Sequence, residues 1–142
     1  MNKLNNNSEL DVKLIKHYIK DLSFENPQSI KDNNAENNNN NNISASINLL
    51  YNPFENNFYS IIFKYSCECS SKISKKNLFL LELEYFGFFK ILNNKSNNQT
   101  LFTKIGAQLL FPFVKSIVED LSAKGGSIPI TLEDTDFDLI KV

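Results

Sequence analysis

The stretch YSIIFKYSCEC, from Tyr59 to Cys69, decides the fold. Large apolar or thiol side chains occupy every second position, and Ser60, Lys64 and Glu68 lie among the positions between them. Successive side chains of a β-strand point to opposite faces, so this period of two is typical of a strand with one buried face. The stretch is therefore predicted to be a strand of a sheet that is covered on one side.

Similar patterns flank this strand. Ile43–Tyr51 alternates apolar residues with Ser and Asn before Asn52-Pro53 stops it, and Leu78–Phe89 alternates after a polar turn. Three consecutive strands joined by short polar connections predict an antiparallel meander.

The first segment of the chain is ambiguous. Val12, Ile15, Tyr18, Ile19 and Leu22 fit the period of a helix. A strand fits equally well, with Asp21, Ser23 and Glu25 on one face and the following residues on the other: Val12, Leu14, Tyr18, Leu22 and Phe24. Periodicity alone does not choose between the two.

Asparagine-rich segments mark connections between these elements. We expect a single domain over residues 1–142, with flexible Asn-rich segments at 1–9 and 32–42. An alternative reading of the run Asn37–Asn42 is a prion-like tract, but a surface loop is favoured because Asn is well tolerated in turns.

The C-terminal third changes to a helical period. Apolar residues from Leu110 to Leu121 recur at spacings of three and four, which predicts an amphipathic helix. Pro112 is expected in its first turn and Gly125 in a left-handed C-cap. A shorter preceding helix is expected from Thr100 to Ile105, ending at Gly106.

Charge and hydropathy exclude several classes of function. The net charge is −1 with no basic stripe, so no nucleic-acid partner is expected. Residues 1–9 have no apolar core, so we expect no secretory signal. No apolar run was found near the roughly 20 residues that span a membrane. The chain is therefore expected to be cytoplasmic and not inserted in a membrane.

Enzyme and metal signatures are missing from the sequence. The four glycines form no phosphate loop, and His17, the single histidine, has no patterned catalytic partner. Glu82 and Glu84 share a strand face, where solvated carboxylates are commoner than a catalytic pair. Cys67 and Cys69 are too few for a zinc site or a disulfide scaffold. We expect a protein that is not an enzyme and uses no cofactor or metal.

Aromatic residues are abundant, with 12 Phe and 5 Tyr. In the run Tyr85–Phe89 both faces of the strand carry large apolar groups. One layer of helix cannot bury both faces of a sheet. We therefore expect either another subunit on the second face or an exposed apolar groove, which is typical of an interaction surface.

Several strings in a fixed order resemble the SecB family of bacterial protein-export chaperones. The strings are Lys20–Pro27 (KDLSFENP), Leu80–Tyr85 (LLELEY), Gly87-Phe88-Phe89, Leu109–Phe113 (LLFPF), and Gly125-Gly126 followed by Asp136-Phe137. The resemblance implies that the first segment is a strand. The expected fold is then α+β, with a four-stranded antiparallel sheet, a long crossover after Pro27, and C-terminal helices packed on one side.

The resemblance also implies a function. SecB-like chaperones bind unfolded secretory precursors, keep them competent for translocation and deliver them to the motor SecA, as a homotetramer built from two dimers. Motif by motif, the SecA-binding positions fall on Asp21, Glu25, Leu80 and Glu82. The positions carried over to a client-binding groove are Phe54, Tyr85, Phe88, Phe89, Ile128 and Ile130.

Two other functions compete with this expectation. A SecB-like module could serve one dedicated partner, such as an antitoxin, and a small-molecule-binding or enzymatic α+β domain would need a pocket with convergent polar groups. The first alternative predicts failure on generic unfolded clients, whereas the second has no counterpart in the sequence.

Overall fold

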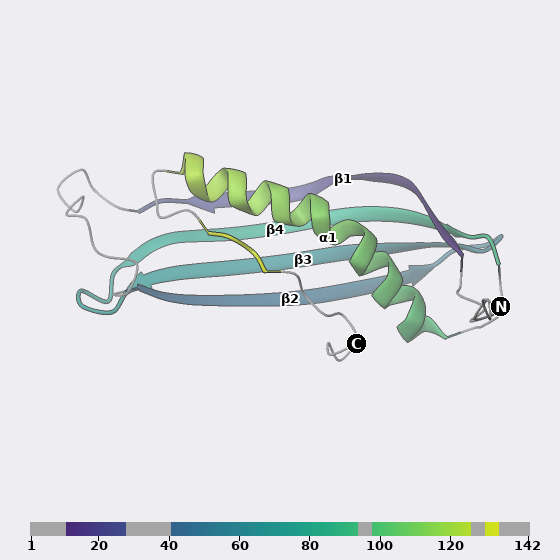
Figure 1. The fold of residues 1–142 in the computed structure, drawn as a ribbon, viewed down its shortest axis with the longest axis horizontal. Helices are drawn as coiled ribbons and strands as arrows, with labels where there is room; N and C mark the ends of the chain where they lie inside the picture. Colours follow the sequence, from purple (N-terminus) through teal and green to yellow (C-terminus); the bar gives the residue numbers. More distant parts are fainter. Residues whose placement is uncertain (1–10, 28–40, 94–97, 126–129, 134–142) are drawn as a thin grey trace, which may run out of the picture.

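The computed structural model describes residues 11–27, 41–93, 98–125 and 130–133. Within them the elements are β1 (Val12–Glu25), β2 (Asn41–Pro53), β3 (Phe58–Ser71), β4 (Asn77–Ile91) and α1 (Gln99–Lys124). The strands form one antiparallel sheet in the order β1-β4-β3-β2, and α1 lies diagonally across one face (Figure 1). The α+β class, the four-stranded sheet and the crossover from β1 to β2 are confirmed.

The core lies between α1 and the two central strands. Tyr59, Ile61 and Phe63 of β3 are fully buried, and so are Phe79 and Phe89 of β4. The hydroxyl of Tyr59 donates a hydrogen bond to the carbonyl of Phe102 in α1, over 3.0 Å. The alternation that predicted these strands thus reflects one face of the sheet that is buried under α1. We call the opposite face, which points away from α1, the outer face.

The first segment is a strand, but its face assignment needs a correction. The pairing of β1 with β4 shifts register between Leu14 and Lys16, and again between Ile19 and Asp21. Each irregularity moves the following side chains to the opposite face. Tyr18, expected beside Val12 and Leu14, therefore lies on the outer face, where its ring stacks on Phe86 at 4.8 Å between centroids.

The two expected helices are one continuous helix of 26 residues. Asn98 caps it by accepting a hydrogen bond from the amide of Thr100 at 3.0 Å. Gly106 does not end a helix, and Pro112 lies in the interior of α1, not in a first turn. Pro112 and Gln108 are both exposed, so water can reach the Gln108 carbonyl that has no proline N–H to bond.

Gly125 ends α1, but in an ordinary backbone conformation with φ −72°. The expected left-handed cap is therefore wrong. Its amide donates to the carbonyl of Leu121 over 2.7 Å. A Cβ at this position would overlap the ring of Phe24 in β1, so a close approach of the helix end to β1 explains the glycine.

Gly106 allows α1 to approach the sheet, and Gly106→Ala should destabilise the protein. A Cβ there would lie 2.8 Å from Cγ1 of Ile61 and 3.2 Å from the Phe89 ring. Helix propensity alone would make alanine better by about 1 kcal/mol. Because Ile61 and Phe89 are fully buried, we expect the overlap to win and to lower the free energy of unfolding by about 1–2 kcal/mol in urea titrations. A gain in stability would contradict this packing.

By length and composition alone, α1 is long and apolar enough to span a membrane, contrary to the expectation that no apolar run approaches that length. In the structure its apolar stripe covers the sheet instead, with Leu110, Val114 and Val118 fully buried. The core helix of a compact domain meets the same compositional test.

The Asn-rich segments lie mostly outside the described residues. Residues 1–9 and 32–40 are not described, whereas Asn41 and Asn42 form the start of β2. The strand therefore begins two residues before its expected start at Ile43, because both asparagines pair with β3, Asn41 with Ser71 and Asn42 with Ser70.

Cys67 and Cys69 are buried free thiols on the helix-facing side of β3. Burial is the largest cause that raises the pKa of both thiols. In the unfolded chain they ionise near the ordinary value of about 8.5, so the unfolding free energy should be level below that pH and fall as pH rises above it. Urea titrations from pH 7 to 10 check this, and replacing both thiols with Ala or Val should flatten the decline.

Candidate functional site

The outer face of the sheet has an acidic end. Asp21 lies opposite Glu84, Ser23 opposite Glu82, and Glu25 opposite Leu80 in the pairing of β1 with β4. The four residues that the resemblance assigns to SecA binding, Asp21, Glu25, Leu80 and Glu82, are thus gathered on this one surface. Their sequence strings are more than fifty residues apart, and the antiparallel pairing of β1 with β4 brings them together.

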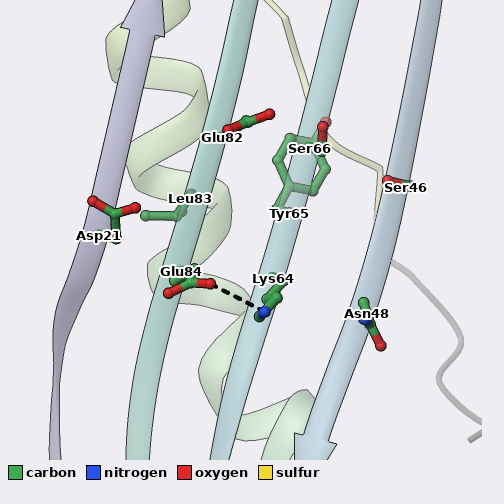
Figure 2. Close-up of a pocket in the computed structure, with 9 residues that line it drawn as sticks. All are labelled: Asp21, Ser46, Asn48, Lys64, Tyr65, Ser66, Glu82, Leu83 and Glu84. Atoms are coloured by element: carbon green, nitrogen blue, oxygen red, sulfur yellow. Dashed lines mark ion pairs between the residues drawn. The ribbon is translucent and has the colours of Figure 1, made fainter.

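A shallow hollow of about 260 Å³ crosses all four strands near the middle of β2, β3 and β4, and Asp21 and Glu82 line it. Figure 2 shows the residues that line it, of which Tyr65 and Leu83 have their side chains buried on the helix side. The full set is Asp21, Ser46, Asn48, Lys64, Tyr65, Ser66, Glu82, Leu83 and Glu84. Three carboxylates against one ammonium give the hollow a negative charge. The arrangement fits a partner that presents basic groups.

Lys64 and Glu84 form an ion pair across β3 and β4, with 3.2 Å between Nζ and Oε1 (Figure 2). Both side chains are partly exposed, so the pair contributes at most about 1 kcal/mol. Because Lys64, the lysine that lines the hollow, pairs with Glu84, the carboxylates of Asp21 and Glu82 have no lysine partner within the hollow. Sequence reasoning missed Lys64 here because its neighbour across the sheet is known only from the register of β3 on β4.

The opposite end of the outer face is aromatic. The rings of Phe58 and Phe88 stack at 5.2 Å between centroids, and Phe54 meets Phe88 edge-on at 5.6 Å. Lys90 Nζ lies 5.4 Å from the Phe58 centroid, and Phe54 is 49% exposed. We call Phe54, Phe58 and Phe88 the aromatic end. One face of one sheet therefore carries an apolar contact surface and an acidic one at its two ends.

The comparison with protein families identifies this fold. The model of preprotein translocase subunit SecB matches residues 5–140. The chain belongs to the SecB family. Among its relatives, the protein-export protein SecB of Ruegeria sp. is 33% identical over 91% of this chain and 79% of its own length. That of Paracoccus denitrificans is 31% identical over 89% of this chain and 72% of its own length.

A solved structure has the same fold. The SecB-like chaperone of Mycobacterium tuberculosis, in complex with a ChAD peptide from the HigA1 antitoxin, superposes with a TM-score of 0.69. The match covers 87% of this chain and 90% of that one at 11% identity. At this sequence identity the similarity supports the SecB fold alone.

The positions expected in a SecB client groove do not form one surface. Phe54 and Phe88 lie together at the aromatic end, but Phe89 is fully buried under α1 and Tyr85 is 5% exposed. Adjacent strand residues point to opposite faces, which separates Phe88 from Phe89. The expectation that Phe89 lines a client groove is therefore corrected to a core role, and Ile128 lies outside the described residues.

Two of these SecB positions have specific partners on the helix side. The Tyr85 hydroxyl lies 2.6 Å from Nδ1 of His17, and burial raises the pKa of Tyr85. Ile130 is 9% exposed, and its amide donates to the Ser122 hydroxyl over 2.9 Å. Ile130 is thus hydrogen-bonded to α1 and buried. It is therefore a core residue, and the expectation that it lines a client groove is also corrected.

Metal binding has no support in the described part of this SecB chain. No group of three or more His, Cys, Asp or Glu side chains there is arranged to hold an ion. The SecB family is not an enzyme family.

Proposed function

We propose that this chain is a cytoplasmic bacterial export chaperone that binds unfolded secretory precursors and delivers them to SecA. Membership of the SecB family supports the chaperone role. The observation that carries the delivery step is the acidic end, where Asp21, Glu25, Leu80 and Glu82 share one exposed surface. Carboxylates beside a leucine can steer and then hold a partner that presents basic and apolar groups.

Exposed apolar side chains support the binding of unfolded chains. They are present on both sides of the sheet: Ile19, Leu22, Ile43, Leu50 and Phe54. Contact with apolar surface is non-directional, so such a surface can hold segments of many sequences. We assign Phe54 and Phe88 to client contact. Tyr85, Phe89 and Ile130 are not assigned to it, because their side chains are buried.

We further propose that four copies assemble as a dimer of dimers through the helix side. Leu109 and Phe113 of α1 are each 38% exposed, on the helix that would face another subunit. Their burial would remove apolar surface from water at about 25 cal/mol per Å². This assembly leaves the outer face of each sheet available for SecA.

A module for one dedicated partner is the second candidate. The structural neighbour from Mycobacterium tuberculosis is in complex with an antitoxin peptide, so the fold can serve a single peptide. The two candidates differ in the range of chains they bind.

Suppression of aggregation distinguishes the export chaperone from the module for one dedicated partner. Several unrelated secretory precursors are diluted from denaturant, and turbidity is followed with and without the protein. We expect suppression for all of them at about one tetramer per precursor, and none for the same proteins once folded. Failure on every generic client would favour the dedicated module and contradict the export role.

A further inference from the structure

A row of large apolar side chains crosses the middle of the outer face. Leu50 of β2 lies opposite Ile62 of β3. Ile62 lies opposite Phe86 of β4, which in turn lies opposite Tyr18 of β1. We call these four residues the apolar row, and two of them, Leu50 and Tyr18, are 42% and 43% exposed. The face of a sheet that meets water is usually polar, so an apolar row across all four strands marks a surface for contact.

Opposite charges lie on the two sides of the apolar row. Toward the aromatic end, Lys13 lies opposite Lys90, and toward the acidic end, Asp21 lies opposite Glu84. Like charges directly opposite each other on neighbouring strands are destabilising, and each side of the row has such a pair. The charged residues that the register places on the outer face are Lys13, Lys16 and Lys90 on the first side, and Asp21, Glu25, Lys64, Glu68, Glu82 and Glu84 on the second.

The three lysines of the first side have no carboxylate partner among the described residues. No ion pair joins them to Asp11 or Glu55, which adjoin this side in the sequence, or to any other described carboxylate. Lys16 instead holds its Nζ 5.6 Å from the ring centroid of Tyr18. Their charges are therefore available to a partner that presents carboxylates and an apolar surface side by side.

We propose that two copies of this chain stack outer face on outer face, about a two-fold axis that runs along the apolar row. The rotation lays each member of the row against the same residue of the second copy and reverses the direction of the strands. It also exchanges the two charged sides. The inference goes beyond the proposed function and does not rest on it.

The register shows which charges this rotation brings together. Lys16 and Asp21 are the paired outer residues of β1 on either side of Tyr18, so Lys16 of one copy lies over Asp21 of the other. Lys90 and Glu82 lie equally far from the apolar row on β4, so they meet in the same way. Each contact occurs twice, as in any isologous interface.

A second copy fits this charge pattern better than an unfolded client or an anionic surface does. A client of arbitrary sequence has no fixed order of charges. An anionic surface would attract the lysines but repel the carboxylates on the other side of the row. Only a partner with the mirrored order, positive, apolar and negative, satisfies both sides at once, and the rotated chain has that order.

The area of the contact indicates a weak and reversible interface. The overlap runs from Lys13 to Ser23 along β1, about 35 Å, and spans four strands, about 19 Å. It covers about 650 Å² on each copy, so the total of about 1,300 Å² is near the lower end for specific interfaces. Because α1 lies on the opposite side of the sheet, stacking is compatible with an assembly through the helix side.

Stacking would cover both contact surfaces of the outer face. Asp21 and Glu82 of the acidic end lie within the overlap, and so does Phe88 of the aromatic end. A stacked copy should therefore bind no further partner through this face. The stack is a resting state that forms at high protein concentration and dissociates on dilution.

Mass against concentration and salt is the first test. The purified protein is followed by sedimentation velocity from about 1 μM to about 1 mM. At about 0.01 M salt the mass should rise with concentration, and at about 1 M salt, where charges are screened beyond ~3 Å, it should rise much less. A mass that stays constant over this range at low salt would overturn the inference.

A charge swap tests the pairing of the two sides. Asp21→Lys/Glu82→Lys and Lys16→Glu/Lys90→Glu should each stack at least roughly tenfold more weakly than wild type. A mixture of the two variants should recover stacking to within about threefold of wild type, because both sets of contacts again join opposite charges. A mixture that associates no better than either variant alone would overturn the inference.

The control for the swap carries the same charge at another place. Lys72→Glu/Lys75→Glu changes two exposed lysines of the turn between β3 and β4, so its net charge equals that of Lys16→Glu/Lys90→Glu. Mixed with Asp21→Lys/Glu82→Lys, it should not recover stacking. Equal recovery would show a general attraction between oppositely charged proteins and would overturn the inference.

Crosslinking tests the position of the axis. Leu50→Cys lies on the axis, so a bis-maleimide about 10 Å long, the spacing of stacked sheets, should join two copies through it. Ser44→Cys is exposed on the same strand and face but lies far from the axis, so it should give no such product. Equal yields from both would overturn the inference. A product that joins Leu50→Cys to added reduced α-lactalbumin, with none between copies, would identify an unfolded client as the occupant and overturn it as well.

Discussion

Phe89→Ala should lower the free energy of unfolding by about 3–5 kcal/mol. The side chain is fully buried, its ring stacks on that of Tyr59 at 5.0 Å between centroids, and it lies against Gly87 and Gly106. Truncation removes a large apolar group and leaves a cavity that the helix and sheet cannot close completely. A loss of this size is comparable with the whole stability of a marginal domain, so urea titration should show a much lower midpoint or no folded baseline.

Phe88→Ala is the matched control on the next residue. Phe88 points to the outer face and contacts Phe54 and Phe58 at the partly exposed aromatic end. We expect a loss of only about 1 kcal/mol, together with weaker binding of unfolded clients. If Phe88→Ala were as destabilising as Phe89→Ala, the assignment of the two faces of β4 would be wrong.

Glu82→Lys should weaken SecA binding roughly ten- to hundredfold. Glu82 is exposed, lies opposite Ser23 and Ser66, and contributes one of three carboxylates to the hollow at the acidic end. Reversal of its charge removes an attraction for a basic partner and adds a repulsion. Titration of SecA at low salt gives the affinity, and the difference from wild type should shrink as salt screens the charges.

Glu55→Lys is the control for this charge reversal. Glu55 is exposed in the connection between β2 and β3, beside the aromatic end and far along the sheet from the hollow. It should change SecA affinity little, and both variants should keep their affinity for unfolded clients. Loss of SecA and client binding together in Glu82→Lys would contradict the division of the outer face into two contact surfaces.

The central strands β3 and β4 were predictable because each buries one face under α1. In β3 and β4 the residues under α1 are apolar at every second position, and that pattern is visible without a structure. β1 lies at an edge, where Ile15, Tyr18 and Ile19 are all exposed by more than two fifths of their surface. Weak burial leaves a weak pattern, and the two register shifts break the alternation further. The family resemblance was needed to choose strand over helix.

The continuous helix was not predictable from local signals. Gly106 and Pro112 commonly punctuate helices, and here both lie inside α1. Contacts with the sheet override their low propensity, since Gly106 lies against Ile61 and Phe89 while Pro112 faces solvent.

The family resemblance assigned Asp21, Glu25, Leu80 and Glu82 to SecA binding motif by motif. The pairing of β1 with β4, which was not predicted from the sequence, is what places the four residues on one surface. The client positions failed because burial under α1 depends on packing: Tyr85 and Phe89 face the helix, whereas Phe54 and Phe88 face away. Lys64 and Phe58 became visible as partners only through the register of the central strands.

The most direct test of the chaperone function is the mass of the purified protein by light scattering, alone and after a slow-folding secretory precursor is diluted into it from denaturant. We expect a particle close to four times 16.3 kDa that gains the mass of one precursor and stays soluble. A monomer or dimer whose mass does not change in the presence of the unfolded precursor would contradict the proposed function.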